Sequence, residues 1–250
     1  MTQFLTTPEG QRIAYALTPG AGPAVVFLGG FKSDMTGTKA QWLDARCRAQ
    51  GRAFLRFDYA GHGQSGGAFE QGCIGDWLAD ARAALGLVAG PVVLVGSSMG
   101  GWIALLLARA LPERVAGLVG IAAAPDFTED GYWAGFDAAT RAALMRDGSV
   151  AVPSEYGAPY VITRRLIEDG RDHLVLRDPL ALDMPVRLLQ GTADADVPMG
   201  WALRLIGHAT GPDIRLTLVK GADHRFSTPA CLDAIGAAVD EVLALVESEE

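Results

Sequence analysis

Hydrophobic residues in this chain fall into short continuous runs, and most runs are followed by a longer segment with helical spacing. The first clear run, residues 24–28, reads Ala-Val-Val-Phe-Leu and precedes a helix-like segment near residues 38–50. Runs of this kind are typical of strands buried on both faces of a parallel sheet. The pattern repeats, with strands predicted at residues 53–57, 92–95, 115–121, 186–189 and 214–218 and helices near residues 74–88, 99–112 and 228–246. This alternation predicts an α/β fold with a doubly wound, mostly parallel sheet.

Two parts of the chain depart from this alternation. Residues 12–17 alternate between polar and apolar positions, as expected for a half-exposed edge strand. Between about residues 125 and 184, aromatic residues crowd a region with short helix candidates at 137–146 and 160–168. We interpret this region as a small cap inserted into a single domain that spans residues 1–250. The alternative is a surface excursion that only covers the edge of the sheet.

Composition and charge narrow the possible partners. Hydrophobic residues make up 50% of the chain and charged residues 20%, an ordinary balance for a globular protein with a sizeable core. The net charge of −8 argues against nucleic acid and anionic membranes, because both attract basic surfaces. Three widely spaced cysteines fit a reducing compartment, and residues 1–19 show no signal-peptide pattern. We therefore expect a cytoplasmic protein without membrane insertion.

The most informative motif is Gly96-Ser97-Ser98-Met99-Gly100, which lies between a predicted strand and a predicted helix. A G-x-S-x-G motif in this context predicts a nucleophile elbow, a sharp turn that exposes the serine hydroxyl above the sheet. The flanking glycines avoid collisions with the neighbouring strand and helix. The sequence therefore predicts Ser98 as a catalytic nucleophile rather than as part of an ordinary Gly/Ser turn.

A serine nucleophile needs a base to accept its proton and a carboxylate to orient that base. The loops after two later strands supply both, because Asp194 follows the strand at 186–189 and His224 follows the strand at 214–218. The carboxyl ends of parallel strands meet at one edge of the sheet, where such folds build their sites. We therefore predict a triad of Ser98, Asp194 and His224.

Other candidates for the acid and the base are weaker. Asp196 could exchange roles with Asp194, but Asp194 has the Gly-x-x-Asp spacing after the strand. Asp223 adjoins the base in sequence, an arrangement that usually points a carboxylate away from the imidazole. The other histidines, on an early loop, in the cap and after a surface helix, are His62, His173 and His208. None of these three has the position that the base requires.

The negatively charged oxygen of a tetrahedral intermediate needs two fixed hydrogen-bond donors. We predict the backbone N–H of Met99, at the start of the helix after the nucleophile, and that of Phe31, after Gly29-Gly30. The alternative for the two glycines is a plain turn. The chain shows no phosphate-binding glycine-rich loop and no metal-ligand cluster, so neither a metal nor another cofactor is expected.

With these residues placed, the chain resembles the α/β-hydrolase superfamily along essentially its whole length. Within it, the chain resembles the mitochondrial palmitoyl-protein thioesterases, also described as acyl-glucuronide esterases, and their bacterial relatives. The segments that carry the resemblance are residues 37–40, 56–61, 96–102, 153–156 and 223–225. The resemblance implies ester or thioester hydrolysis, on small molecules or acylated proteins, through the same triad. Gln190 departs from the family pattern, which often has histidine there, and the missing mitochondrial presequence favours a bacterial cytoplasmic enzyme.

The leading interpretation is therefore a serine esterase or thioesterase that forms an acyl-enzyme on Ser98. A C–C bond hydrolase or peptidase with the same triad, and a non-catalytic ligand-binding protein with the same fold, are the alternatives. Candidate substrate contacts are Trp133, Phe136, Tyr156 and Tyr160 in the cap, joined by the side chains of Phe31 and Met99. Such a wall favours an apolar acyl chain of medium length. The alternative is that these aromatic residues only pack the cap onto the sheet.

Overall fold

The computed structural model describes residues 2–154, 157 and 159–248, and one large sheet forms its centre. Its eight strands lie in the order β1-β2-β4-β3-β5-β6-β10-β12. The pairs β1–β2 and β2–β4 are antiparallel, and every pair from β4 to β12 is parallel. The strands are β1 (Gln3–Thr6), β2 (Arg12–Thr18), β3 (Ala21–Leu28), β4 (Arg52–Phe57), β5 (Val92–Ser97), β6 (Val115–Ile121), β10 (Val186–Gly191) and β12 (Ile214–Val219). The predicted mostly parallel sheet is confirmed.

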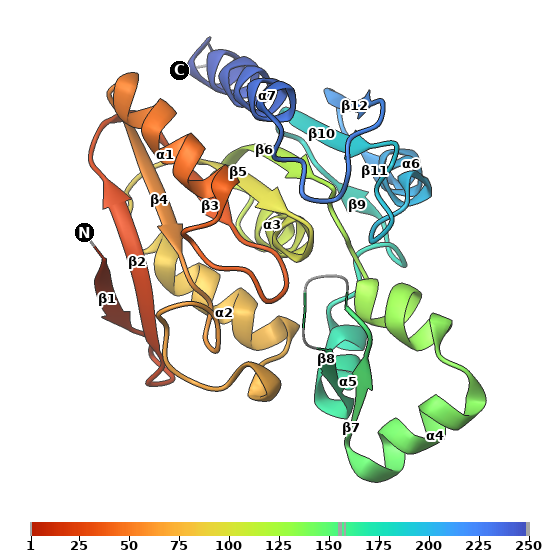
Figure 1. Ribbon diagram of the computed structural model, residues 1–250. Helices are drawn as coiled ribbons and strands as arrows, with labels where there is room; N and C mark the ends of the chain where they lie inside the picture. Colours follow the sequence, from red (N-terminus) through yellow and green to blue (C-terminus); the bar gives the residue numbers. More distant parts are fainter. Residues whose placement is uncertain (1, 155–156, 158, 249–250) are drawn as a thin grey trace.

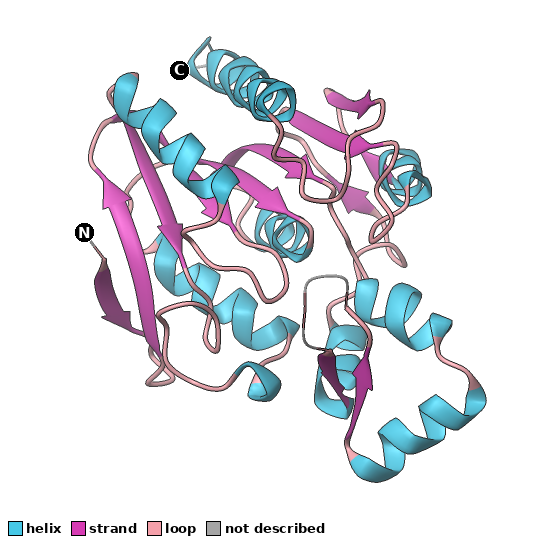
Figure 2. Ribbon diagram, in the orientation of Figure 1, coloured by secondary structure: helices cyan, strands magenta, loops and turns pink. Residues whose placement is uncertain are grey.

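Helices cover both faces of this sheet, as Figure 1 and Figure 2 show. Neighbouring residues of a strand point to opposite faces. Val93 of β5 therefore belongs to the core beneath α1 (residues 38–49) and α7 (residues 229–248), and Leu94 to the core beneath α2 (residues 74–85) and α3 (residues 99–110). This two-sided burial is the reason that the central strands are continuous apolar runs. The helices outside residues 122–185 are α1 (Thr38–Ala49), the short η1 (Phe69–Gln71), α2 (Ile74–Leu85), α3 (Met99–Ala110), α6 (Met199–His208) and α7 (Pro229–Ser248).

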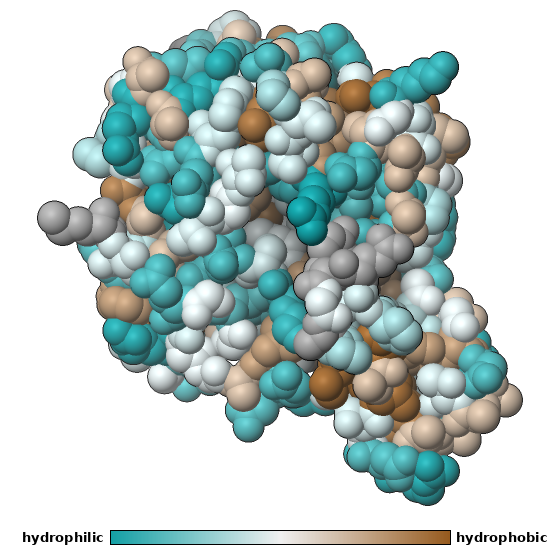
Figure 3. All heavy atoms as spheres, viewed as in Figure 1, coloured by the Kyte–Doolittle hydropathy of each residue, from teal (hydrophilic) through white to brown (hydrophobic). Residues whose placement is uncertain are grey.

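Residues 122–185 connect β6 to β10, and this cap segment projects beyond one end of the sheet (Figure 1). Apolar residues gather around β7 (residues 149–152) and α4 (residues 138–147) on the face seen in Figure 3. β7 pairs with β8 in antiparallel fashion, and β9 pairs with β11, which follows α6. The elements are the π-helical η2 (Phe127–Trp133), α4 (Ala138–Asp147), β7 (Ser149–Val152), β8 (Tyr160–Thr163), α5 (Arg164–Asp172), β9 (Leu180–Ala181) and β11 (Ala209–Thr210).

Two local expectations were wrong. The helix expected at residues 160–168 begins only at Arg164, because Tyr-Val-Ile-Thr before it consists of good strand formers and pairs with β7. Thr163 then caps α5 by accepting the N–H of Leu166 at 3.1 Å. The segment at residues 12–17 is not the edge of the sheet either, because β1 pairs along its outer side.

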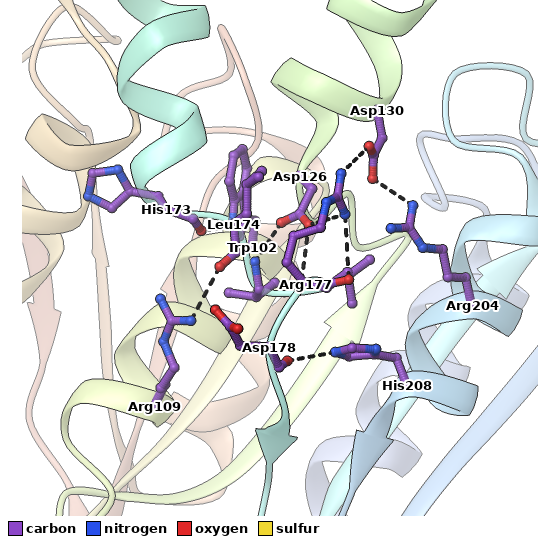
Figure 4. A network of polar contacts seen from close by, with 12 residues as sticks. Trp102, Arg109, Asp126, Asp130, His173, Leu174, Arg177, Asp178, Arg204 and His208 are labelled. Atoms are coloured by element: carbon purple, nitrogen blue, oxygen red, sulfur yellow. Dashed lines mark hydrogen bonds and ion pairs between the residues drawn. The ribbon is translucent and has the colours of Figure 1, made fainter.

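A network of ion pairs and hydrogen bonds fixes the two ends of the cap segment (Figure 4). Asp126, which is fully buried, accepts the backbone N–H groups of residues 175–176 at 2.8 and 3.0 Å. Arg177 pairs with both Asp126 and Asp130, and Asp130 also pairs with Arg204 of α6. The cap is thereby held to the helix that borders the site. Among the described residues, no helix is long and apolar enough to cross a lipid bilayer.

Candidate active site

Ser98 lies at the sharp turn between β5 and α3. Its backbone has φ 55° and ψ −117°, a conformation that is strained for a residue with a side chain. A Cβ on Gly96 would lie 2.4 Å from the carbonyl oxygen of Gly100, and one on Gly100 would lie 2.0 Å from that of Leu28. Both positions therefore require glycine, and the close packing holds the strained turn at the carboxyl edge of the sheet.

The structure brings Ser98, His224 and Asp194 together from the ends of β5, β12 and β10. His224 Nε2 lies 3.2 Å from Ser98 Oγ, and His224 Nδ1 lies 2.9 Å from Asp194 Oδ2. The Asp194 side chain is fully buried, whereas 19% of the His224 side chain is exposed. A carboxylate can only accept, so the contact assigns the imidazole proton to Nδ1. Nε2 is then free to accept the hydroxyl proton of Ser98.

The Asp194 carboxylate accepts four hydrogen bonds. Oδ1 accepts the N–H groups of Asp196 and Val197 at 3.0 and 2.8 Å, and Oδ2 accepts Gln190 Nε2 at 3.0 Å in addition to His224. Gln190 Nε2 also donates to the carbonyl of Val197 at 2.9 Å. A reversed amide would place an oxygen against these acceptors, so the orientation of Gln190 is settled by its surroundings. The glutamine at the position where histidine is common thus contacts the carboxylate directly.

Asp194, Asp196 and His224 offer ligand atoms within 4.8 Å of one another, an arrangement that could hold a metal ion. The nitrogens of His224 are, however, already paired with Ser98 and Asp194. Both oxygens of Asp194 also accept hydrogen bonds from uncharged donors. The hydrogen bonds therefore favour proton transfer between these side chains over the binding of a metal ion.

The loop after β3 passes beside the nucleophile. A Cβ on Gly30 would lie 3.4 Å from Ser98 Cβ. Among the hydrogen bonds of the described residues, none uses the N–H of Phe31. Met99 is the first residue of α3, so its N–H has no acceptor within the helix. Two backbone donors are thus available next to Ser98.

A cavity of about 740 Å³ opens at Ser98 and His224. Of the aromatic residues predicted to contact substrate, Tyr160 and Phe31 line it. The ring of Trp133 instead lies against Arg171, 4.6 Å from its guanidinium carbon, and Phe136 stacks on Tyr132. Neither Trp133 nor Phe136 is among the described residues that line the cavity. Tyr156 lies outside the described residues, and the Met99 side chain is fully buried.

Four aromatic residues among the described lining of the cavity were not predicted, namely Phe27 of β3, Phe127, Tyr132 and Trp201. Phe127 and Tyr132 belong to η2, whose π-helical turn lacks the usual helical spacing. Trp201 comes from α6, which lies outside the cap. The density of aromatic residues at 127–133 was the available signal, but it did not show which rings face the cavity.

Charged residues form another part of the cavity wall. Lys39, in the first turn of α1, donates from Nζ to the backbone carbonyl of Arg225, next to His224. Burial lowers the pKa of Lys39 to about 8, and the nearby carboxylates of Asp223 and Asp194 partly oppose this shift. Lys39 therefore ties α1 to the loop that carries the histidine. The charged residues of the wall are Lys32, Asp34, Lys39, Asp196 and Arg225.

His62, which we did not assign to the triad, lies buried beneath the loop after β3, with 3% of its surface exposed. Its Nε2 lies 3.1 Å from the backbone nitrogen of Lys32, and its Nδ1 lies 3.2 Å from the carbonyl oxygen of Ala60. Burial lowers the pKa of His62 to about 4. The imidazole is therefore neutral at physiological pH.

This low pKa predicts acid-sensitive stability. Between about pH 6.5 and pH 4 the unfolded chain binds a proton at His62 that the folded protein does not, so stability falls as the pH falls. From about pH 7 to pH 4.5, the wild type should lose on the order of 2 kcal/mol more unfolding free energy than His62→Gln. Urea unfolding at the two pH values measures the difference. Equal losses in the two proteins would contradict the prediction.

The strand order, the serine elbow and the chain order Ser98, Asp194, His224 define the class of the protein as an α/β-hydrolase. A family model described as serine aminopeptidase, S33, matches residues 22–157, and the chain belongs to this family. The palmitoyl-protein thioesterase ABHD10, mitochondrial, from Rattus norvegicus is 34% identical over 243 residues, covering 96% of this chain and 82% of that protein.

Solved structures agree with this placement. The crystal structure of a protein from Agrobacterium vitis S4 has a TM-score of 0.93 and 41% identity, covering 97% of this chain and 98% of that chain. The mouse α/β-hydrolase domain-containing protein 10 has a TM-score of 0.91 and 32% identity, covering 100% of both chains. The chain is thus a serine hydrolase of the ester and thioester type.

Proposed function

We propose that Ser98, Asp194 and His224 form the catalytic triad of an esterase or thioesterase that acts on apolar acyl groups. The observation that carries this proposal is the continuous hydrogen-bonded chain from Ser98 Oγ through His224 to the buried Asp194. This arrangement allows the imidazole to accept the hydroxyl proton while the carboxylate stabilises the imidazolium that forms.

In the proposed first half-reaction, Ser98 Oγ attacks the carbonyl carbon as His224 Nε2 takes its proton. The carbonyl oxygen becomes negatively charged and accepts hydrogen bonds from the N–H groups of Phe31 and Met99. The bond to the leaving alkoxide or thiolate then breaks, and His224 returns its proton to that group. The acyl group remains on Ser98 as an ester.

In the second half-reaction, water replaces the leaving group. His224 takes a proton from the water, whose oxygen attacks the acyl carbon of the Ser98 ester. The same two N–H groups stabilise the oxyanion. Collapse of the intermediate breaks the ester bond, returns the proton to Ser98 Oγ and releases the carboxylic acid. No step requires a cofactor.

The substrate proposal rests on the aromatic part of the cavity wall. Phe31, Phe127, Tyr132, Tyr160 and Trp201 line the cavity together with the nucleophile. Such a surface stabilises a hydrocarbon chain, by about 0.8 kcal/mol for each fully buried methylene. The name of the rat relative, a palmitoyl-protein thioesterase, supports an acyl substrate, including one carried on a protein.

We expect kcat/KM to rise from acetyl to about octanoyl esters or thioesters and then to level off. The increase should be at most about fourfold for each added methylene. A p-nitrophenyl ester series from acetate to palmitate, run beside acyl-cysteine and acyl-CoA thioesters, measures the profile. Tyr132→Ala should lower the octanoyl-to-acetyl ratio, whereas Trp133→Ala, outside the cavity wall, should leave it unchanged. A profile that is flat or peaks at acetate would reject the apolar-acyl proposal.

Three further assays separate the alternative functions. Reaction with a fluorophosphonate labels an activated serine, so an unlabelled protein would be a ligand-binding protein with this fold. Turnover of aminoacyl-p-nitroanilides in place of esters would favour a peptidase, in line with the description of the matching family model. Turnover of a vinylogous diketone in place of esters would favour C–C bond hydrolysis.

We also propose that residues 1–250 act as one hydrolase domain and that this domain works in a reducing compartment, the cytoplasm. The support for the location is that Cys47, Cys73 and Cys231 are all free thiols and all buried. Fractionation of the source cells, followed by immunodetection, tests the location.

A further inference from the structure

The residues after Gly30 form a tight turn with an unusual third position. The carbonyl of Gly30 accepts the N–H of Ser33 at 3.1 Å and its hydroxyl at 2.8 Å, which closes the turn. Lys32, the third residue, has φ 59°. This left-handed conformation usually belongs to glycine or asparagine at such a position, and it costs energy for a residue with a long side chain. The turn therefore needs support from outside.

The direction of the Phe31 N–H follows from this turn. In a trans peptide the carbonyl and the N–H point in opposite directions. Since the carbonyl of Gly30 points to Ser33, the N–H of Phe31, in the same peptide unit, points out of the turn. The next peptide unit, between Phe31 and Lys32, must keep the orientation that gives Lys32 its left-handed conformation. Otherwise Ser33 loses its hydrogen bonds to the carbonyl of Gly30.

His62 holds that next peptide. Its Nε2 lies 3.1 Å from the N–H of Lys32, and its Nδ1 lies 3.2 Å from the carbonyl of Ala60. A carbonyl only accepts, so Nδ1 carries the proton and Nε2 is the acceptor. The carbonyl of Ala60 is itself fixed, because Trp77 Nε1 donates to it at 3.1 Å. The ring of His62 is packed edge-to-face against Phe69 and Trp77, with centroids 5.1 and 5.2 Å away.

We propose that His62 is a positioning residue for the oxyanion hole. Its neutral imidazole accepts the N–H of Lys32, holds the strained turn closed, and so aims the N–H of Phe31 at the carbonyl oxygen of the substrate. The inference rests on the proposed triad and oxyanion hole, and it adds a residue that touches neither the substrate nor Ser98. The pKa of about 4 keeps the accepting nitrogen unprotonated at neutral pH.

Three replacements of His62 separate this role from packing. In His62→Gln, Oε1 occupies the place of Nε2 and can still accept the N–H of Lys32. His62→Asn places its amide near the position of Nδ1, so it keeps the donor to Ala60 and removes the acceptor. His62→Phe keeps an aromatic ring against Phe69 and Trp77 and removes both hydrogen bonds.

The measurement compares p-nitrophenyl octanoate with its thiono analogue, in which sulfur replaces the carbonyl oxygen. An oxyanion hole stabilises charge on oxygen much better than on the larger sulfur, so its loss mainly slows the oxygen ester. We expect kcat for the oxygen ester to fall about 10- to 100-fold in His62→Asn and His62→Phe, with KM within about threefold. The oxygen-to-sulfur ratio should fall by at least about tenfold, and His62→Gln should retain most of it. Fluorophosphonate titration gives the concentration of active sites in each variant.

A folded His62→Asn or His62→Phe protein with the wild-type oxygen-to-sulfur ratio would overturn the inference. So would equal losses for both esters, which are expected if His62 only stabilises the fold. Should His62→Phe fail to fold, the comparison of Asn with Gln still decides the question. Failure of the proposed function is a different result, in which the wild-type protein neither hydrolyses the esters nor reacts with the fluorophosphonate at Ser98.

Discussion

Replacement of Ser98 by alanine, or of His224 by alanine, is expected to lower kcat by at least about 10⁴-fold without unfolding the protein. Ser98→Ala removes the nucleophile, and His224→Ala leaves the hydroxyl without a group to take its proton. The double variant should lose little more than either single variant, because the residues act as one unit. Kinetics with p-nitrophenyl octanoate and thermal unfolding measure the two properties.

The matched control is the neighbouring Ser97→Ala. Ser97 is the last residue of β5 and is buried, with 5% of its surface exposed. We expect this variant to keep fluorophosphonate labelling, which Ser98→Ala should lose completely. Full turnover in Ser98→Ala, or loss of labelling in Ser97→Ala alone, would remove Ser98 from the assigned role, and full turnover in His224→Ala would remove His224 from the role of the base.

The sheet could be predicted from sequence because its central strands are buried on both sides. Val93 and Leu94 enter opposite cores, so β5 must be apolar throughout, and its pattern cannot be taken for an amphipathic helix. β1 and the β7–β8 hairpin lack this signal. The strands β1, β7 and β8 have only four residues each. The strand that each one pairs with depends on the course of the chain between them, and the local sequence pattern does not encode that course.

That the three residues proposed for the triad come together was also predictable, because β5, β10 and β12 are parallel and end at one edge of the sheet. The choice between Asp194 and Asp196 was not settled by spacing alone. It depends on backbone donors, since the N–H groups of residues 196–197 both point to Asp194 Oδ1. Such contacts depend on loop conformation, which has no periodicity to detect.

The least predictable part of the site was the set of hydrogen bonds that residues distant in sequence make to its loops. His62 and Lys39 act on loops that are 30 and 186 residues away in sequence, through Lys32 and Arg225 respectively. The sequence indicated that His62 is a hydrogen-bonded loop residue rather than the base, but not which groups it contacts. Its burial and its hydrogen bond to the backbone appear only when the loops after β3 and β4 come together in the folded chain.

The second large effect is expected at Asp194, the proposed acid of the triad. Asp194→Asn is expected to lower kcat by about 10⁴-fold, the loss that follows when an amide forces the histidine into the wrong tautomer. The two backbone N–H groups at Oδ1 will hold the amide oxygen there, so the amide NH₂ must take the place of Oδ2. It then faces His224 Nδ1, which has to become an acceptor. Nε2 then carries the proton and can no longer accept one from Ser98.

Gln190 cannot adapt to the new amide. Its Nε2 would oppose the new NH₂, and turning its amide over would place an oxygen against the carbonyls of Val197 and Gly191. Asp196→Asn is the matched control, because Asp196 donates to Asp194 through its backbone, which the substitution leaves in place. We expect this control to lose less than about tenfold in kcat. Steady-state kinetics of both variants from about pH 6 to pH 9 tests the assignment, and a larger loss in Asp196→Asn than in Asp194→Asn would transfer the role of the acid to Asp196.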